Sequence, residues 1–221
     1  MRIGDNTKIE LNEKACIRSA KMLDKIFKEN NVEYWLDCGT LLGVIRDKKF
    51  IPWDTSDIEF YMFYKKKEDI LKILKSLKEE GFELIVYDLN NPRRGVCIKD
   101  KKGWGHMSFG WFKKTPLNRF CSFLCYYLPK FIRKRIMNFT HKYYSNSKSE
   151  IIRPFDGDKR VNHKLSCMVR NWLPIFFCWK LEDVDFYDFK VTVPKKSEDL
   201  LYFRYGPDWK IPKKKYESYF T

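Results

Sequence analysis

The sequence predicts an α+β fold in which helices flank a mixed β-sheet. Three observations support this prediction: segments with helical and with strand periodicity alternate over 11–80, three short strands separated by turn residues follow over 82–112, and a strand and a short helix come near the end, over 184–205. The 221 residues, 44% of them hydrophobic, can build one core of ordinary size. We therefore expect a single domain over 1–221.

The first half is expected to form helix, strand, helix, strand and helix, in that order. Apolar residues recur at helical spacing over 11–30, and a short strand over 34–37 runs into a turn with a helical piece behind it. Residues 57–63 alternate acidic or aromatic side chains with apolar ones, which predicts a strand. Residues 68–80 carry one apolar face and end at Gly81, which predicts a helix.

The second half is expected to add a meander, a helical insertion and two closing elements. The predicted meander strands are 82–87, 96–99 and 106–112. The insertion covers 113–180, with helices over 117–127 and 131–139. One strand over 184–193 and one helix over 198–205 complete the prediction.

The charge balance favours anionic partners. Forty-four Lys and Arg against 29 Asp and Glu give a formal net charge of +15. Such an excess suits nucleotides, nucleic acid, phosphorylated glycans or an anionic membrane, although a solvated lysine-rich surface accounts for it equally well. The positive charges are scattered and no nucleic-acid-binding motif is present, which argues against nucleic acid.

Cysteine usage and hydropathy bear on the compartment. Seven irregularly spaced cysteines indicate reduced thiols, which predicts a cytoplasmic protein; a zinc site built around Cys121 and Cys125 is the less favoured alternative. Residues 1–6 show no apolar signal core, and no run of about 18 apolar residues suggests a spanning helix. Residues 117–139 mix aromatic with basic side chains, which allows peripheral membrane contact or a helical cap on the sheet.

Residues 34–60 contain the pattern that indicates phosphate and metal binding. A strand delivers the chain into Gly39-Thr40, where the missing side chain of Gly39 lets a phosphate approach backbone amides. The next strand carries Asp57 and Glu59, and its period of two puts both carboxylates on one face. Two such carboxylates repel unless a cation lies between them, and hard oxygen ligands suit Mg²⁺ or Mn²⁺. The alternative is an acidic pair on a solvated edge strand.

The same stretch resembles the LicD family, which includes bacterial phosphocholine transferases and fukutin-type ribitol-phosphate transferases. The residues that carry the resemblance are Trp35-Leu36-Asp37-Cys38-Gly39-Thr40-Leu41-Leu42-Gly43-Val44-Ile45-Arg46, then Phe50-Ile51-Pro52-Trp53-Asp54 and Asp57-Ile58-Glu59. A second matching stretch lies over 186–209. The resemblance covers about 10–112 and about 170–212, and two separated motifs in the right order make it fairly specific.

The resemblance implies a nucleotidyltransferase fold that transfers a substituted phosphate from a CDP-linked donor. The implied acceptor is a hydroxyl on a glycan or glycolipid, as in lipopolysaccharide or teichoic acid biosynthesis. By position, Gly39 and Thr40 would hold donor phosphate and Arg46 would be a further phosphate partner. Asp57 and Glu59 would be the catalytic carboxylates, binding Mg²⁺ or Mn²⁺.

The sequence departs from the family pattern at three places. Thr55-Ser56 adds one residue before the acidic strand, and Glu59 replaces the usual second Asp. Ser108 stands where the family has a third carboxylate, and His106, on the same strand face, is expected to be a substitute metal ligand. A third carboxylate often acts as general base, so a catalytically inactive nucleotide- or glycan-binding member of the fold is the alternative.

Overall fold

The computed structural model describes residues 13–52, 58–64, 67–86, 96–100, 106–129, 132 and 175–213. The strands are β1 (Tyr34–Leu36), β2 (Ile58–Tyr64), β3 (Phe82–Val86), β4 (Val96–Asp100), β5 (His106–Lys113), β6 (Leu181–Phe186) and β7 (Phe189–Pro194). The helices are α1 (Glu13–Glu29), α2 (Cys38–Leu42), the π-helix η1 (Gly43–Asp47), α3 (Lys67–Glu79), α4 (Pro116–Tyr127), the 3₁₀ helix η2 (Phe177–Trp179) and α6 (Ser197–Tyr205).

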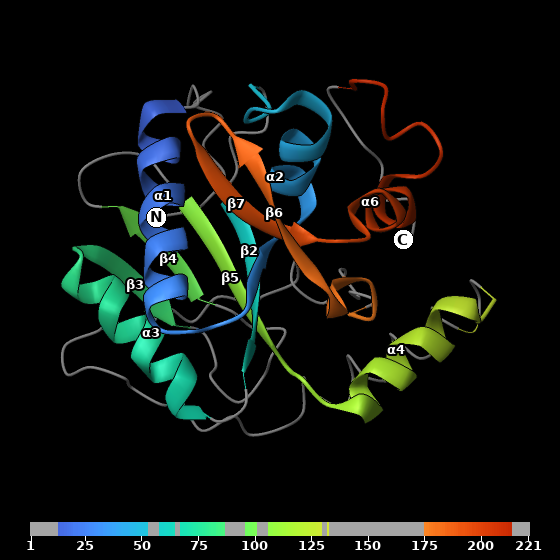
Figure 1. Cartoon of the computed structure of the whole chain (residues 1–221), viewed down its shortest axis with the longest axis horizontal. Helices are drawn as coiled ribbons and strands as arrows, with labels where there is room; N and C mark the ends of the chain where they lie inside the picture. Colours follow the sequence, from blue (N-terminus) through green and yellow to red (C-terminus); the bar gives the residue numbers. More distant parts are fainter. Residues whose placement is uncertain are drawn as a thin grey trace, which may run out of the picture.

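The central feature is a five-stranded sheet with the order β1-β2-β5-β4-β3 (Figure 1). β2 and β5 run parallel, whereas β1–β2, β5–β4 and β4–β3 are antiparallel. The predicted α+β class with a mixed sheet and a meander is thereby confirmed. α1 and α3 contact each other, and β7 contacts β1, so the β6–β7 hairpin lies beside the edge of the sheet that carries β1.

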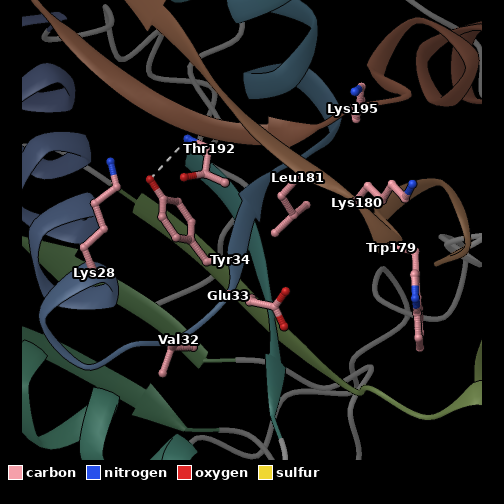
Figure 2. Close-up of a pocket in the computed structure, with 9 residues that line it drawn as sticks. All are labelled: Lys28, Val32, Glu33, Tyr34, Trp179, Lys180, Leu181, Thr192 and Lys195. Atoms are coloured by element: carbon pink, nitrogen blue, oxygen red, sulfur yellow. Dashed lines mark hydrogen bonds between the residues drawn. The ribbon is translucent and has the colours of Figure 1, made fainter.

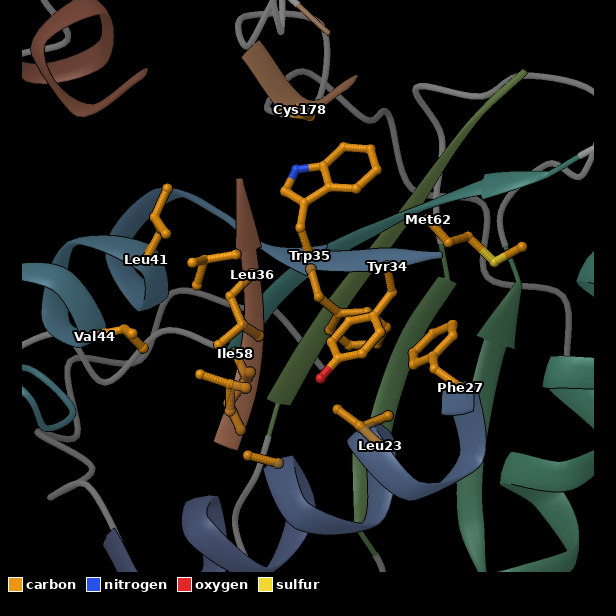
Figure 3. Packing of buried hydrophobic residues seen from close by; sticks show 14 of the residues in the cluster. Leu23, Phe27, Tyr34, Trp35, Leu36, Leu41, Val44, Ile58, Met62 and Cys178 are labelled. Atoms are coloured by element: carbon orange, nitrogen blue, oxygen red, sulfur yellow. The ribbon is translucent and has the colours of Figure 1, made fainter. Parts of the chain in front are cut away.

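The short strand β1 is buried on both faces, which explains why Tyr34, Trp35 and Leu36 show no polar alternation. On one face the Tyr34 ring stacks on Phe27 of α1, with ring centroids 4.8 Å apart. On the other face Trp35 points away from α1 and toward Cys178 (Figure 3). β1 is thus fixed between the first helix and the last third of the chain, and its end is held in place.

An aromatic layer joins β1 to the centre of the sheet. The Trp35 ring lies 5.9 Å from Tyr61, 4.8 Å from Phe63 and 6.2 Å from Phe112. Gly110 of β5 is the register partner of Tyr61, and a Cβ at Gly110 would lie 2.4 Å from a ring atom of Tyr61. The missing side chain therefore makes room for the tyrosine ring on the neighbouring strand.

The prediction of one strand over 184–193 is wrong. The structure has two antiparallel strands, β6 and β7, joined at Tyr187 and Asp188. Tyr187 takes a φ of +54°, a region that tyrosine rarely adopts. Because glycine or asparagine usually occupies such a position in a tight hairpin, the sequence here gives no sign of the turn. Tertiary contacts hold the turn: the Tyr187 hydroxyl donates to Glu13 and accepts the Phe50 N–H.

The predicted insertion can be followed only in part. Within 113–180 the structure describes 113–129, 132 and 175–180, so the bounds of the insertion stay a prediction. The predicted helix over 117–127 is confirmed as α4, and the one over 131–139 lies outside the described residues except for Ile132. Within the part of the chain that the structure describes, no helix has the length and apolarity needed to cross a bilayer.

Candidate functional site

The candidate site begins at the end of β1, where Asp37 caps α2. The carboxylate of Asp37 accepts the backbone N–H of Cys38 at 2.7 Å. Cys38 has a φ of +49°, a left-handed conformation that is costly for a residue with a Cβ. The chain therefore turns sharply before Gly39, and the surrounding contacts must hold the strained turn in place.

Glu59 of β2 lies against this turn through several hydrogen bonds. Its carboxylate oxygen Oε2 accepts the N–H of Gly39 at 3.1 Å. Its own N–H donates to Oγ1 of Thr40 at 2.9 Å, and its carbonyl accepts the N–H of Asp37 at 3.0 Å. Gly39, Thr40 and Glu59, predicted separately from the sequence, are thus brought together at one point.

A buried ion pair supports the turn from α6. The guanidinium of Arg204 meets both carboxylate oxygens of Asp37, with Nε at 2.9 Å and Nη2 at 2.6 Å. The Arg204 side chain is 9% exposed and that of Asp37 is fully buried. Burial acts to lower the pKa of Arg204, but the Asp37 carboxylate outweighs it and the pKa lies well above its ordinary value. Asp37 is thereby committed to a structural role.

The thiol in the turn is not set up as a nucleophile. Burial raises the pKa of Cys38 well above its ordinary value; the guanidinium of Arg204 opposes this and Glu59 adds to it. Burial likewise raises the pKa of Tyr61 and Tyr205, which stay neutral beside the turn. Among the described residues at the turn, the charges are carried by Glu59 and the Asp37–Arg204 pair, and covalent catalysis by Cys38 is disfavoured.

Arg46, the predicted phosphate partner, lies in η1 and is engaged by its neighbour. Its Nε and Nη2 donate to the two carboxylate oxygens of Asp47 at 2.8 and 2.7 Å. A third nitrogen lies 3.5 Å from the carbonyl of Trp209, and the Arg46 side chain is only 6% exposed. Binding a phosphate would require Arg46 to exchange Asp47 for the ligand, and its role stays a prediction.

Two predicted residues fall wholly or partly outside the described part of the chain. Asp57 lies outside the described residues, and for His106 the structure describes the strand position, at the start of β5, but not the side chain. The parallel register pairs Glu59 with Ser108, and the place of Ser108 at the position of a third carboxylate stays a prediction. Among the residues that the structure describes, no group of three His, Cys, Asp or Glu side chains could hold a metal ion.

The structure adds two residues that sequence reasoning missed, Asp37 and Arg204. Asp37 carries a local signal, since an aspartate directly before the first residue of a helix, here Cys38, is a typical helix cap. Arg204 carried a weaker one, because it stands in a short helix among apolar and aromatic residues. Their pairing spans 167 residues of sequence, and no local pattern encodes it.

Comparisons with known proteins agree with the motif. A family model described as "LicD/FKTN/FKRP, nucleotidyltransferase domain" matches residues 31–167, more than half of the chain. Uncharacterized protein RP689 of Rickettsia prowazekii is 26% identical over 74 residues, which cover 34% of this chain and 27% of that protein. Uncharacterized protein RT0683 of Rickettsia typhi is 30% identical over 60 residues, 27% of this chain and 19% of that protein. The matched segments thus span about a quarter or less of these relatives.

Proposed function

The chain belongs to the LicD family, and on that premise we propose that it transfers a substituted phosphate from a CDP-linked donor to a glycan or glycolipid hydroxyl. The family assignment supports phosphotransferase chemistry in general. The transferred group we propose is of the phosphocholine or polyol-phosphate kind. The compartment we propose is the cytoplasm, in keeping with the buried cysteines Cys16, Cys38 and Cys178, which are reduced.

The observation that carries the proposal is the hydrogen bond from the Gly39 N–H to the carboxylate of Glu59. A carboxylate oxygen and a phosphate oxygen make the same demand on an amide, namely a charge-assisted bond at about 2.7–3.1 Å. The Gly39 N–H can therefore donate a hydrogen bond to an anion, and the strained turn at Cys38 fixes its orientation. A donor phosphate can take this bond when the Glu59 side chain turns away.

The other residues of the turn are proposed to position this amide. Thr40 is 4% exposed and its hydroxyl oxygen already accepts the Glu59 N–H, so it fixes α2 against β2 rather than meeting the donor directly. The Asp37–Arg204 pair holds the start of the turn, and Arg204 neutralises the Asp37 carboxylate. That neutralisation keeps a negative charge from repelling an incoming phosphate.

The residues proposed to hold a divalent cation are Asp57 and Glu59, with His106 as a further ligand. The half-buried carboxylate of Glu59 offers the hard oxygen donors that Mg²⁺ or Mn²⁺ prefers, while the raised pKa of Cys38 keeps its thiol protonated and out of competition. When bound, such a cation would neutralise charge on the phosphoryl oxygens. Asp37 is excluded from the ligand set because Arg204 occupies both of its oxygens.

Calorimetric titration of the full chain with cytidine diphosphate, with and without Mn²⁺, tests the proposal. We expect binding that needs the cation and that weakens about 10- to 100-fold in Glu59→Gln, since a neutral amide is a poor ligand for a hard cation. Glu182→Gln, an exposed acid of β6, is the matched control and should bind as the wild type does. Cation-independent binding, or equal binding by the two variants, would contradict the proposal.

A second candidate, a binding-only member of the family, is favoured by the register of Glu59 with Ser108. Serine is not a general base at neutral pH, so the acceptor hydroxyl would lack its proton acceptor. Release of cytidine monophosphate from CDP-choline, measured with glycan acceptors, distinguishes the two. Cation-dependent nucleotide binding without any release would support the binding-only role.

A further inference from the structure

Helix α4 carries aromatic rings that are open to solvent. Phe120, Phe123 and Tyr127 are 58%, 42% and 68% exposed. At about 100° per residue, the three side chains fall within an arc of about 60° around the helix. We refer to Phe120, Phe123 and Tyr127 as the α4 aromatic stripe.

The orientation of α4 is fixed by a different arc of the same helix. The hydroxyl of Ser122 accepts the N–H of Phe176 at 3.1 Å. The ring of Tyr126 lies 5.4 Å from Phe176, 5.2 Å from Phe177 and 5.4 Å from Phe203. Phe123 of the stripe also lies 5.5 Å from Phe176, so its ring takes part in this packing, whereas Phe120 and Tyr127 remain 58% and 68% exposed.

Cationic side chains border the stripe. The stripe lines a cavity of about 1190 Å³ together with four exposed cations and one acid, namely Arg119, Lys180, Lys195, Lys196 and Asp199. Lys180 and Lys195 also line a second cavity of about 480 Å³, and Figure 2 shows Lys180 next to Trp179. The same face therefore combines exposed rings with a local excess of positive charge.

This combination points to an anionic lipid surface. Apart from Asn118, Arg119 and Ser122, every residue of α4 is apolar, aromatic or cysteine, and none is acidic. Twelve residues make a helix of about 18 Å, too short to span a bilayer of about 30 Å. Aromatic rings suit the boundary between headgroups and acyl chains, and flanking cations suit lipid phosphates. An apolar protein partner would not require the cations.

We propose that the α4 aromatic stripe and its basic border dock on an anionic membrane surface. The stripe enters the headgroup region while Arg119, Lys180, Lys195 and Lys196 meet lipid phosphates. Tyr126, next to the stripe, lies 5.4 Å from Phe203 of α6, the helix that also carries Arg204, so α6 links the stripe to the candidate site. The inference does not depend on the proposed function, because its test measures lipid binding alone.

Co-sedimentation of the full chain with vesicles tests the inference. The wild type is expected to bind vesicles that contain phosphatidylglycerol, more weakly at high salt, and not vesicles of phosphatidylcholine alone. Phe120→Ser/Tyr127→Ser should lose about fivefold in partitioning per half-exposed ring. The matched control is Tyr202→Ser, which removes a 50% exposed ring of α6 and should change nothing.

A second set of variants tests the contribution of the lysines. Lys195→Gln/Lys196→Gln should lose about 25-fold, at about fivefold per lysine near an anionic surface. Lys72→Gln/Lys75→Gln, which removes two exposed lysines of α3, should match the wild type. Circular dichroism establishes that each variant is folded. Absence of wild-type binding, equal binding to both kinds of vesicle, or equal losses in test and control variants would each overturn the inference.

Discussion

The buried pair between Arg204 and Asp37 gives the sharpest test of the folded structure. Replacing Arg204 by Met keeps an apolar stem of similar length but removes both charge-assisted hydrogen bonds to Asp37. Within the described part of the chain, the N–H of Cys38 is then the one donor left to the fully buried Asp37 carboxylate. Leaving one half of a buried ion pair without its partner costs about 3–5 kcal/mol. At about 2–4 °C per kcal/mol for a chain of this size, the melting temperature should fall by about 6–20 °C.

The double variant Asp37→Asn/Arg204→Met separates charge from packing. Asparagine can still cap Cys38, and no charge is left buried, so most of the lost stability should return, to within about 1.5 kcal/mol of the wild type. Urea unfolding at pH 7 measures each free energy, with Arg119→Met as a control for loss of an exposed arginine. The reasoning is refuted if Arg204→Met costs less than about 1 kcal/mol, or if the double variant is as unstable as the single one.

Two further predictions concern packing and alkaline stability. Gly110→Ala should lose about 1–3 kcal/mol in urea unfolding, because the new methyl group would overlap the ring of Tyr61; an unchanged midpoint would contradict the close approach. Burial, and to a smaller extent the hydrogen bond to Asp24, raises the pKa of Tyr34 in the folded chain. Because the phenol of Tyr34 therefore ionises at lower pH in the unfolded chain, the free energy of unfolding falls above about pH 10, by up to about 1.4 kcal/mol per pH unit. Tyr34→Phe should be less stable at pH 7 by about 1 kcal/mol but lose stability less steeply in alkali, whereas Tyr202→Phe should follow the wild type.

Local sequence patterns predict the helices and strands that are determined by their own residues. The apolar face of α1, the alternation along β2 and the stop at Gly81 each predicted an element that the structure contains. The β6–β7 hairpin was missed because Tyr187 occupies a turn position that its side chain does not favour. Glu13 and Phe50 stabilise that turn from elsewhere in the chain, and such contacts leave no trace in the local pattern.

The candidate site was predictable in its parts and not in its electrostatics. The sequence predicts a glycine turn and an acidic strand separately, and the structure places Gly39, Thr40 and Glu59 in hydrogen-bond contact. The sequence did not predict that Asp37 is neutralised by Arg204, because the pair depends on α6 contacting α2. Asp57 lies outside the described residues, and its role as a metal ligand stays a prediction.

The bond between Glu59 and the Gly39 amide has a thermodynamic consequence under the proposed function. If a bound cation draws the Glu59 carboxylate away from the turn, the Gly39 amide becomes available to a nucleotide phosphate. Cation and nucleotide then favour each other's binding, and linkage requires the factor to be the same in both directions. A glutamate in place of the family's aspartate would in this way make the two ligands cooperative.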